Sequence, residues 1–328
     1  MINNLIIYSI ITFFIFISLS MVSYRLNLVD KPNKRKQHLA PTAYTGGLAI
    51  SIAYVISLII FDVGQSLNLI ISISFLMAVV GFIDDKYHLN IGGKLSLQMI
   101  PIVYLIIIEG FNLRQIGDYG YFYLKLNSFS IPFTLIAVLF LINSFNYFDG
   151  IDGTLGFTSI TTLAILYFLI ADETIKLFLV CISIPISIFL CFNFSLFKIP
   201  KLFLGDSGSL LLGFILSFTL IHLANKNFVH PILLAWSIQI FVYEFISINL
   251  IRLKNRKDPF TAGLDHLHHI LIRKKNSIFM TNFVISITNI ILFIIGFIVF
   301  EFINPFASLI LFIIFFIIFF ILRIKYST

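Results

Sequence analysis

The stretch Asn143-Ser-Phe-Asn-Tyr-Phe-Asp-Gly-Ile-Asp-Gly153 ends a long apolar run and carries polar side chains at strict three-residue spacing. These side chains are Asn143, Asn146, Asp149 and Asp152. Each three-residue step turns a regular α-helix by about 300°, so neighbours in the series share a face while its first and last members point in opposite directions. We therefore predict that the helix ends within a residue or two of Gly150, with the amides on its last turn and the carboxylates on the turn into the next helix.

The composition on either side of this stretch is that of a protein that lies in lipid. The 328 residues are 59% hydrophobic and 11% charged, and their mean hydropathy is +1.03. Continuous apolar runs of roughly 16 to 22 residues have the length that a helix needs to cross about 30 Å of hydrocarbon. A β-barrel would instead alternate apolar and polar residues in segments of about ten. The predicted fold class is an all-α polytopic integral membrane protein.

Ten or eleven membrane spans are predicted, and the sequence shows no repeat of fixed period and no low-complexity linker. We therefore expect one transmembrane domain over residues 1–328. The first run is expected to be a retained span, because no basic residue precedes it and no small-residue cleavage site follows it. The eleven apolar runs cover residues 5–23, 45–61, 68–83, 95–109, 132–148, 154–170, 177–194, 209–224, 232–251, 278–300 and 306–322.

The basic residues between the spans indicate an orientation. With the N-terminus outside, 18 of the 22 Lys and Arg residues lie in inside loops and the C-terminal tail. Because Lys and Arg collect on the cytoplasmic side, the sequence predicts an N-out, C-in topology. The formal net charge of +7 is then a topology signal, and without a base-stacking or groove-reading motif we predict no nucleic-acid partner.

Polar clusters gather in the segments that this orientation places inside, which predicts an active site on the cytoplasmic face. Asp84 and Asp85 end one span, where paired carboxylates are costly unless hydrated, paired or bound to a cation; simple boundary carboxylates are the alternative. Asp206 lies among glycines at the start of a span, where it could be a helix N-cap. Capping does not explain the glycines, which leave room for a phosphate or a metal. Asp152 has the same capping alternative.

Three histidines, His266, His268 and His269, stand within four residues and are either a solvated segment or part of a site. A zinc site would need partners such as thiolates, which the inside segments lack, and the carboxylate-rich surroundings favour a hard ion such as Mg²⁺. Glu244 lies within the ninth span, where an unpaired charge is expensive, so a functional role or a buried pair is expected.

Together, the carboxylates, amides, histidines and lysines match a Mg²⁺-dependent reaction on phosphates, in which oxygen ligands hold the ion and cationic groups absorb developing charge. A membrane transporter is the alternative from another class. Its acids would lie near mid-bilayer on discontinuous helices in two repeated halves, whereas here they lie at one predicted face and no repeat is visible.

Four motifs, in their order along the chain, resemble those of the polyprenyl-phosphate N-acetylhexosamine-1-phosphate transferases of glycosyltransferase family 4. They are Asp84-Asp85, the block from Asn143 to Gly153, Phe203-Leu-Gly-Asp-Ser-Gly-Ser209 and His266-Leu-His-His269, within a likeness from about Leu28 to Leu271. The resemblance implies transfer of a sugar 1-phosphate from a UDP-HexNAc donor to undecaprenyl phosphate, with release of UMP, to begin a cell-surface glycan. It also implies Mg²⁺ (or Mn²⁺) as cofactor, the lipid bilayer of the bacterial cytoplasmic (inner) membrane, and relatives that include homodimers.

The resemblance also assigns roles to single residues. Asp206 and Asn146 are the expected Mg²⁺ ligands. Asp84 and Asp85 are the expected catalytic carboxylates that face the polyprenyl phosphate, one of them deprotonating or orienting it, and Lys94 is expected to contact phosphate. Direct in-line attack, which needs no nucleophilic residue, is preferred over an aspartyl-phosphate intermediate.

Further positions follow from the same resemblance. Asp149 and Asp152 are expected to line the nucleotide pocket as catalytic positions, with Phe203 stacked on uracil. His266, His268 and His269 are expected to bind pyrophosphate or sugar. The remaining substrate-binding candidates are Asn143, Asn193, Arg35 and His38.

The fourth motif also bears on the donor sugar. His-Leu-His-His resembles the branch that acts on UDP-N-acetylglucosamine or similar sugars for lipopolysaccharide O-antigen, teichoic acid or other surface glycans. The alternative branch, which transfers phospho-N-acetylmuramoyl-pentapeptide for peptidoglycan, usually has three consecutive histidines there. This chain departs from the common pattern at Tyr147-Phe148, at Tyr243-Glu244 and in the thirteen-residue step from Asn193 to Asp206.

The orientation can be tested by labelling. A cysteine placed at Asn255, in a variant without the two native cysteines, is expected to react with a membrane-impermeant maleimide only from the cytoplasmic side, because Asn255 follows the ninth predicted span in an inside segment. Labelling of intact cells and of inverted vesicles separates the two sides. Reaction in intact cells would invert the predicted topology.

Overall fold

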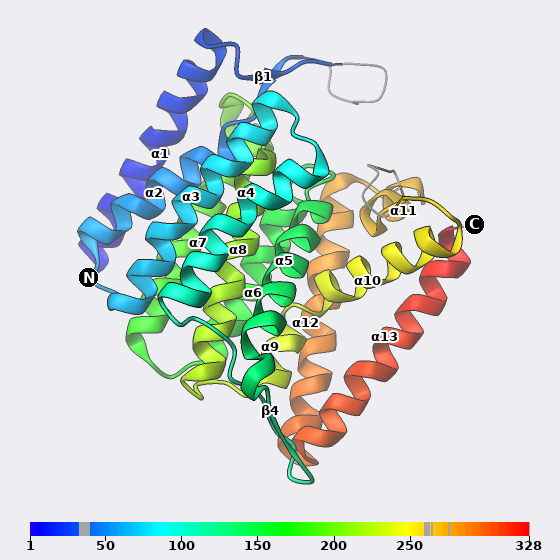
Figure 1. Cartoon of the computed structure of the whole chain (residues 1–328). Coiled ribbons are helices and arrows are strands. Elements are labelled where there is room, and N and C mark those ends of the chain that lie inside the picture. The colour runs from blue at the N-terminus through cyan, green and yellow to red at the C-terminus, as the bar shows by residue number, and fades with distance from the viewer. Residues whose placement is uncertain (33–39, 259–262, 264, 275, 328) are drawn as a thin grey trace. The chain divides into compact units, whose positions relative to one another are not determined.

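The computed structural model describes residues 1–32, 40–258, 263, 265–274 and 276–327 (Figure 1). Two of the predicted substrate-binding residues, Arg35 and His38, lie outside the described residues. The chain divides into two compact units, each made of two separate stretches of sequence and each described here by itself. The first comprises Met1–Leu105 and Ala171–Leu216, and the second comprises Ile106–Ile170 and Ser217–Thr328. The expectation of one functional domain stays a prediction.

The first unit is a bundle of helices with one short antiparallel pairing of β1 with β2. The chain leaves this unit within a π-helical segment, Tyr104–Ile108, returns to it at Ala171 and leaves it again in the middle of α8. Its elements are α1 (Ile2–Arg25), β1 (Val29–Asp30), β2 (Thr42–Ala43), α2 (Gly46–Ile60), α3 (Gln65–Tyr87), α4 (Ile91–Val103), α7 (Glu173–Asn193), a 3₁₀ turn (Leu196–Lys198) and the first part of α8 (Gly205–Asn225).

The second unit is also helical and carries one antiparallel hairpin, β3 with β4. Its elements are β3 (Gln115–Asp118), β4 (Tyr123–Lys125), a 3₁₀ turn (Asn127–Phe129), α5 (Ser130–Phe148), α6 (Thr154–Leu169), α9 (Pro231–Ser237), α10 (Gln239–Lys254), α11 (Leu267–Arg273), α12 (Ile278–Phe302) and α13 (Pro305–Ser327). Helix α5 ends two residues before Gly150, which confirms the predicted end of that helix.

Helices occupy all eleven apolar runs, which confirms an all-α polytopic membrane protein. Within the described ranges, eight helices are long and apolar enough to cross a membrane, or nine if the bent pair α9 and α10 forms one span. Helices α2 and α6, with 15 and 16 residues, are shorter apolar helices. The count of eleven spans and the N-out orientation stay predictions.

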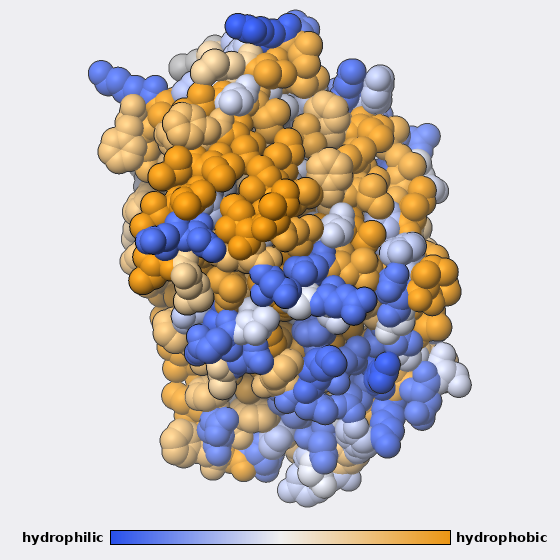
Figure 2. All heavy atoms as spheres, turned by 90° about the vertical axis from the view of Figure 1, so that its left-hand side faces the viewer, coloured by the Kyte–Doolittle hydropathy of each residue, from blue (hydrophilic) through white to orange (hydrophobic). Residues whose placement is uncertain are grey.

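The surface of the helices is that of a protein in lipid. Figure 2 shows one face of the molecule, on which hydrophobic side chains form broad continuous areas and hydrophilic ones gather in patches. Helix α13 illustrates the composition, since Ile310, Ile313 and Ile317 are 42%, 46% and 49% exposed. In water such exposure would be costly, whereas hydrocarbon accepts it without penalty.

The ninth predicted span is broken, which corrects the expectation of one helix over residues 232–251. Helices α9 and α10 meet at Ile238 with a bend of 72°. The carbonyl of Ser237 accepts hydrogen bonds from Thr162 Oγ1 at 3.0 Å and from Asn289 Nδ2 at 3.2 Å. Side chains of neighbouring helices therefore bond the carbonyl at the break, as backbone inside a membrane requires.

Glycines bring α2 and α3 against the first turn of α8 in the first unit. A Cβ atom on Gly47 would lie 2.0 Å from the backbone nitrogen of Gly208, and one on Gly81 would lie 2.4 Å from the carbonyl of Asp206. Gly47 also donates its backbone N–H to the Leu204 carbonyl at 2.9 Å. Only residues without a side chain allow three backbones to approach this closely.

Replacing one of these glycines tests the junction. The Gly47→Ala variant is expected to lose stability by about 1–3 kcal/mol or more, because its methyl group would meet backbone rather than a side chain that could rotate away. Gly92→Ala is the matched control, since its Cβ would meet only Asn90 Oδ1 at 3.7 Å. Thermal unfolding in detergent measures both, and equal melting temperatures would contradict the close approach.

Candidate active site

Two acidic residues and a lysine form the carboxylate cluster of the first unit: Asp84, Lys94 and Asp206. The ammonium of Lys94 lies 2.8 Å from Asp84 Oδ2 and 2.5 Å from Asp206 Oδ2. The three side chains come from the end of α3, the first turn of α4 and the first turn of α8. One cation therefore bridges two carboxylates at the ends of apolar helices, which offsets part of the cost of placing charge there.

The turn from α3 into α4 fixes Asp84 and Lys94. His88 adopts the left-handed conformation that ends α3, and the next backbone N–H, that of Leu89, donates to Asp84 Oδ1 at 2.9 Å. Asn90 then caps α4 by accepting from the Gly93 N–H at 2.7 Å. Lys94 thus lies one turn after the capped start of α4, and these local hydrogen bonds fix the backbone from which its side chain extends.

Asp85 holds the start of α8. Its two carboxylate oxygens accept hydrogen bonds from the backbone N–H groups of Asp206, at 2.9 Å, and Ser207, at 3.1 Å. A carboxylate is favoured at a helix N-terminus, where backbone donors have no intrahelical partner. The interpretation of Asp206 as the cap is therefore wrong: Asp206 lies in the first turn, and Asp85 of α3 supplies the capping carboxylate.

Phe203 and Asn193 lie close to this cluster in sequence. The Phe203 N–H donates to the Ala43 carbonyl at 2.8 Å, and the Lys201 ammonium lies 5.3 Å from the centre of the Phe203 ring. Asn193 is buried, and its Nδ2 donates to the Leu202 carbonyl at 2.8 Å. Asn193 therefore supports the segment that carries Phe203, and a contact with a nucleotide base stays a prediction.

The second unit brings two motifs together, the Asn143–Gly153 stretch and the histidines of residues 266–269. The His268 ring packs directly on Gly150, where an added Cβ would lie 2.1 Å from His268 Nε2. The rings of His266 and His268 stack with centres 5.5 Å apart, and His269 lies 4.4 Å from His268. We call His266, His268 and His269 the histidine cluster.

Two ring nitrogens of the histidine cluster are buried without a hydrogen-bond partner among the described residues. They are His266 Nδ1 and His268 Nε2. Leaving a buried polar atom unpaired costs about 1–3 kcal/mol, so such atoms are rare unless a ligand or water satisfies them. His266 Nδ1 lies 3.9 Å from Glu244 Oε1. His268 Nε2 is therefore the candidate for contact with an oxygen of a bound group.

The histidine cluster is uncharged at neutral pH. Burial, with the nearby Arg252, lowers the pKa of His266 to about 4, and burial holds the pKa of His268 well below its usual value. Burial and Arg273 lower the pKa of His269. Asp265 differs: burial raises its pKa, but the hydrogen bonds and charge of Arg252 outweigh this and bring it to about 2.

The polar residues of the Asn143–Gly153 stretch have different surroundings. Asn143 Nδ2 donates to the Leu139 carbonyl at 2.7 Å, within its own helix. The Asp152 carbonyl accepts from Asn282 Nδ2 at 2.8 Å. Helix α6 begins at Thr154 with Gly153 as its N-cap residue, so Asp152 is not the cap. No described contact assigns a ligand to Asn146, Asp149 or Asp152, and their expected roles stay predictions.

The predicted Mg²⁺ ligands lie in different units, Asp206 in the first and Asn146 in the second, so their shared ion stays a prediction. Among the described residues no group of three His, Cys, Asp or Glu side chains could hold a metal ion. Mg²⁺ is commonly bound through one or two carboxylates together with water and substrate phosphates. Asp84 and Asp206 supply oxygen donors of the kind that Mg²⁺ prefers.

By sequence alone, Arg252 and Arg323 count only as topology signals. Both are buried, and they pair with Asp265 and Glu244 respectively. The expectation of a buried partner for Glu244 is thus confirmed. The signal available in the sequence was the position of Arg323 directly after the last apolar run.

Comparison with known proteins gives one family. The profile of "Glycosyl transferase family 4" matches residues 67–224. An undecaprenyl-phosphate alpha-N-acetylglucosaminyl 1-phosphate transferase of Yersinia pestis is 28% identical over 77% of this chain and 71% of its own length. Its namesake from Escherichia coli K12 is 27% identical over 80% and 76%. A probable undecaprenyl-phosphate N-acetylglucosaminyl 1-phosphate transferase of Bacillus subtilis is 28% identical over 83% and 79%.

The lowered histidine pKa values predict a pH dependence of stability. The unfolded chain protonates His266 near its ordinary pKa of about 6.5, whereas the folded chain does so only near 4, so stability falls as the pH falls through this window. Each such group adds a slope of up to about 1.4 kcal/mol per pH unit. Melting temperatures between pH 7.5 and 4.5 should therefore fall less steeply in His266→Gln than in the wild type, and equal slopes would contradict the burial of the ring.

Proposed function

Because this chain belongs to glycosyl transferase family 4 and is a sugar-phosphate transferase, we propose that it moves an N-acetylhexosamine 1-phosphate from a UDP-sugar to undecaprenyl phosphate. The names of the relatives favour UDP-N-acetylglucosamine or a related UDP-HexNAc as donor over a muramoyl-pentapeptide donor. The products are UMP and an undecaprenyl-pyrophosphoryl sugar. Since the relatives are bacterial, the proposed location is the bacterial inner membrane, with the site at its cytoplasmic face.

The observation that carries this proposal is the Lys94 ammonium between the carboxylates of Asp84 and Asp206. Both substrates are polyanionic, so a cationic group must neutralise charge that would otherwise keep them apart. In this proposal Lys94 contacts a phosphate and exchanges a carboxylate partner for it. Asp84 is then free to orient or deprotonate the acceptor phosphate, as proposed from the family resemblance.

In the proposed reaction an oxygen of undecaprenyl phosphate attacks the β-phosphorus of the UDP-sugar. The bond from that phosphorus to the bridging oxygen breaks, and UMP leaves with the electron pair. No enzyme residue forms a covalent bond. A Mg²⁺ ion held by Asp206 and Asn146 would neutralise charge on the pyrophosphate. The uncharged histidine cluster would donate hydrogen bonds to pyrophosphate or sugar oxygens, and Asp149, Asp152 and Phe203 would line the nucleotide pocket.

Incubation of the purified protein with undecaprenyl phosphate, Mg²⁺ and a panel of UDP-HexNAc donors tests the proposal by the release of UMP. One donor is expected to give undecaprenyl-pyrophosphoryl sugar and UMP in equal amounts. The Asp206→Asn variant is expected to lose turnover by about 100-fold or more, since a metal's electrostatic stabilisation is worth several kcal/mol and each 1.36 kcal/mol is tenfold.

Asp62→Asn is the control for this variant. Asp62 lies between α2 and α3, and its carboxylate accepts only from the exposed Gly64 N–H at 2.9 Å among the described contacts. Its turnover is expected to match the wild type. Folded wild-type protein that releases UMP from no donor would refute the proposed function, and near-normal turnover of Asp206→Asn would remove Asp206 from the metal site.

A further inference from the structure

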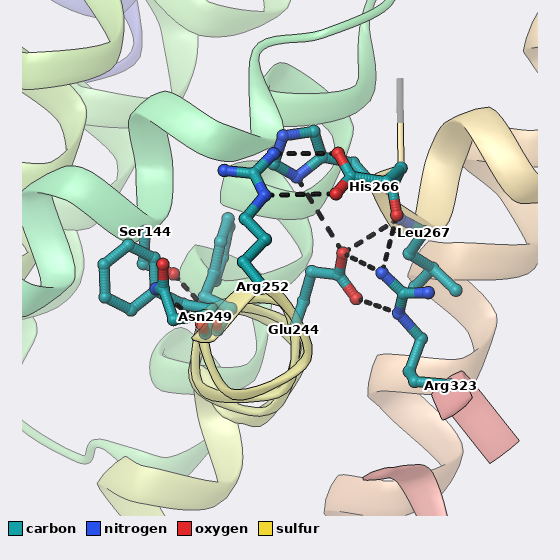
Figure 3. Close-up of polar contacts among 10 residues, drawn as sticks. Ser144, Glu244, Asn249, Arg252, His266, Leu267 and Arg323 are labelled. Carbon is teal, nitrogen blue, oxygen red and sulfur yellow. Dashed lines mark hydrogen bonds and ion pairs between the residues drawn. The ribbon is translucent and has the colours of Figure 1, made fainter. Parts of the chain in front are cut away.

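A buried ion pair joins the last helix to α10. Arg323 of α13 donates from Nε to Glu244 Oε2 at 2.7 Å and from Nη2 to Glu244 Oε1 at 3.0 Å. The side chains are 3% and 1% exposed. Figure 3 shows the Arg323 guanidinium and the Glu244 carboxylate facing each other beside His266 and Leu267.

Both members of this pair also bond the backbone on either side of His266. Glu244 Oε1 accepts from the Leu267 N–H at 2.9 Å, and Arg323 Nη2 donates to the Asp265 carbonyl at 2.8 Å. The peptide groups that enter and leave His266 are therefore each held by one charged side chain. Charge-assisted hydrogen bonds of this kind are stronger and better oriented than neutral ones.

A second ion pair holds Asp265 through its side chain. Arg252 of α10 donates from Nε to Asp265 Oδ2 at 3.0 Å and from Nη2 to Asp265 Oδ1 at 2.8 Å. Its guanidinium lies 5.6 Å from the centre of the Tyr147 ring, at the end of α5. Figure 3 shows Arg252 beside the His266 ring. The backbone that leads into the histidine cluster is thus fixed at Asp265 by two arginines.

This arrangement is poorly explained by stability alone. Desolvation makes a buried ion pair weakly stabilising at best, and apolar residues of similar volume often replace one at no loss. Glu244 and Arg323 nevertheless place charges on apolar helices. Besides bonding each other, they hydrogen-bond the peptide groups on either side of His266. An arrangement of this kind is expected where a backbone must be held in one geometry.

We propose that Arg323 and Glu244 are positioning residues, which hold the backbone of residues 265–267 so that His266 and His268 meet the phosphate oxygens of the donor. This inference rests on the proposed function for the identity of the donor. Neither residue touches substrate in this proposal, and both act through the histidine cluster.

Four variants separate positioning from stability. Arg323→Met removes the charge and leaves Glu244 buried without its partner. Arg323→Lys keeps the positive charge but cannot form the bidentate hydrogen bonds to Glu244. The double variant Glu244→Met/Arg323→Met removes both charges, so that neither charged side chain is left buried without the other, and it also removes their hydrogen bonds to the Leu267 N–H and the Asp265 carbonyl. Lys325→Met is the matched control, because Lys325 lies two residues further along the same helix and is exposed.

Turnover and thermal stability are expected to respond differently. Arg323→Met should lose kcat by about 100-fold, the effect of displacing a reacting group by about 1 Å, and Arg323→Lys should recover part of it. The double variant should recover the melting temperature but not kcat, and Lys325→Met should match the wild type. Recovery of kcat together with stability in the double variant would overturn the proposal, because the pair would then be structural only.

Hydrogen–deuterium exchange measures how firmly the backbone of the histidine segment is held, and it does not depend on turnover. The peptide that contains Asp265 to Arg273 should exchange about tenfold faster or more in Arg323→Met and in the double variant, and at the wild-type rate in Lys325→Met. Unchanged exchange in both arginine variants would overturn the proposal. If the wild type releases UMP from no donor, the proposed function fails, and this exchange measurement still decides whether Arg323 holds the histidine segment.

Discussion

The hydrogen bonds that Asp85 accepts from the first turn of α8 are the contact on which the carboxylate cluster depends. They fix the backbone of Asp206, so that its side chain lies on the Lys94 ammonium. The turn can come this close to α2 and α3 only because glycines leave no Cβ atom in the way. The backbone N–H groups of Asp206 and Ser207 have no intrahelical partner at the start of α8, so the carboxylate of Asp85 satisfies two donors that the helix itself leaves open.

Apolar runs and short motifs predict much of what the described residues show. The helices follow from the length of the runs, and the end of α5 at Phe148 follows from polar residues that no regular helix keeps on one face. These features depend on local sequence, which is why one sequence is enough to predict them.

Other features depend on partners that are distant in sequence. The break at Ile238 has no Pro or Gly to mark it. Thr162 and Asn289, which donate to the Ser237 carbonyl beside the break, lie on other helices. The capping role of Asp85 requires α8 to lie against α3, more than a hundred residues away in sequence. The partner of Glu244 is Arg323, 79 residues later, which a count of basic residues assigns to the tail. Such pairings follow from packing and not from periodicity.

The Glu244–Arg323 pair also bears on the order in which the second unit is assembled. Glu244 belongs to α10, whereas its partner belongs to α13, the last helix in the described part of the chain. Until α13 enters the bilayer, the Glu244 carboxylate has no guanidinium to accept from, and a lone carboxylate is expensive in hydrocarbon. We therefore expect α10 to reach its final position in the bilayer together with α13.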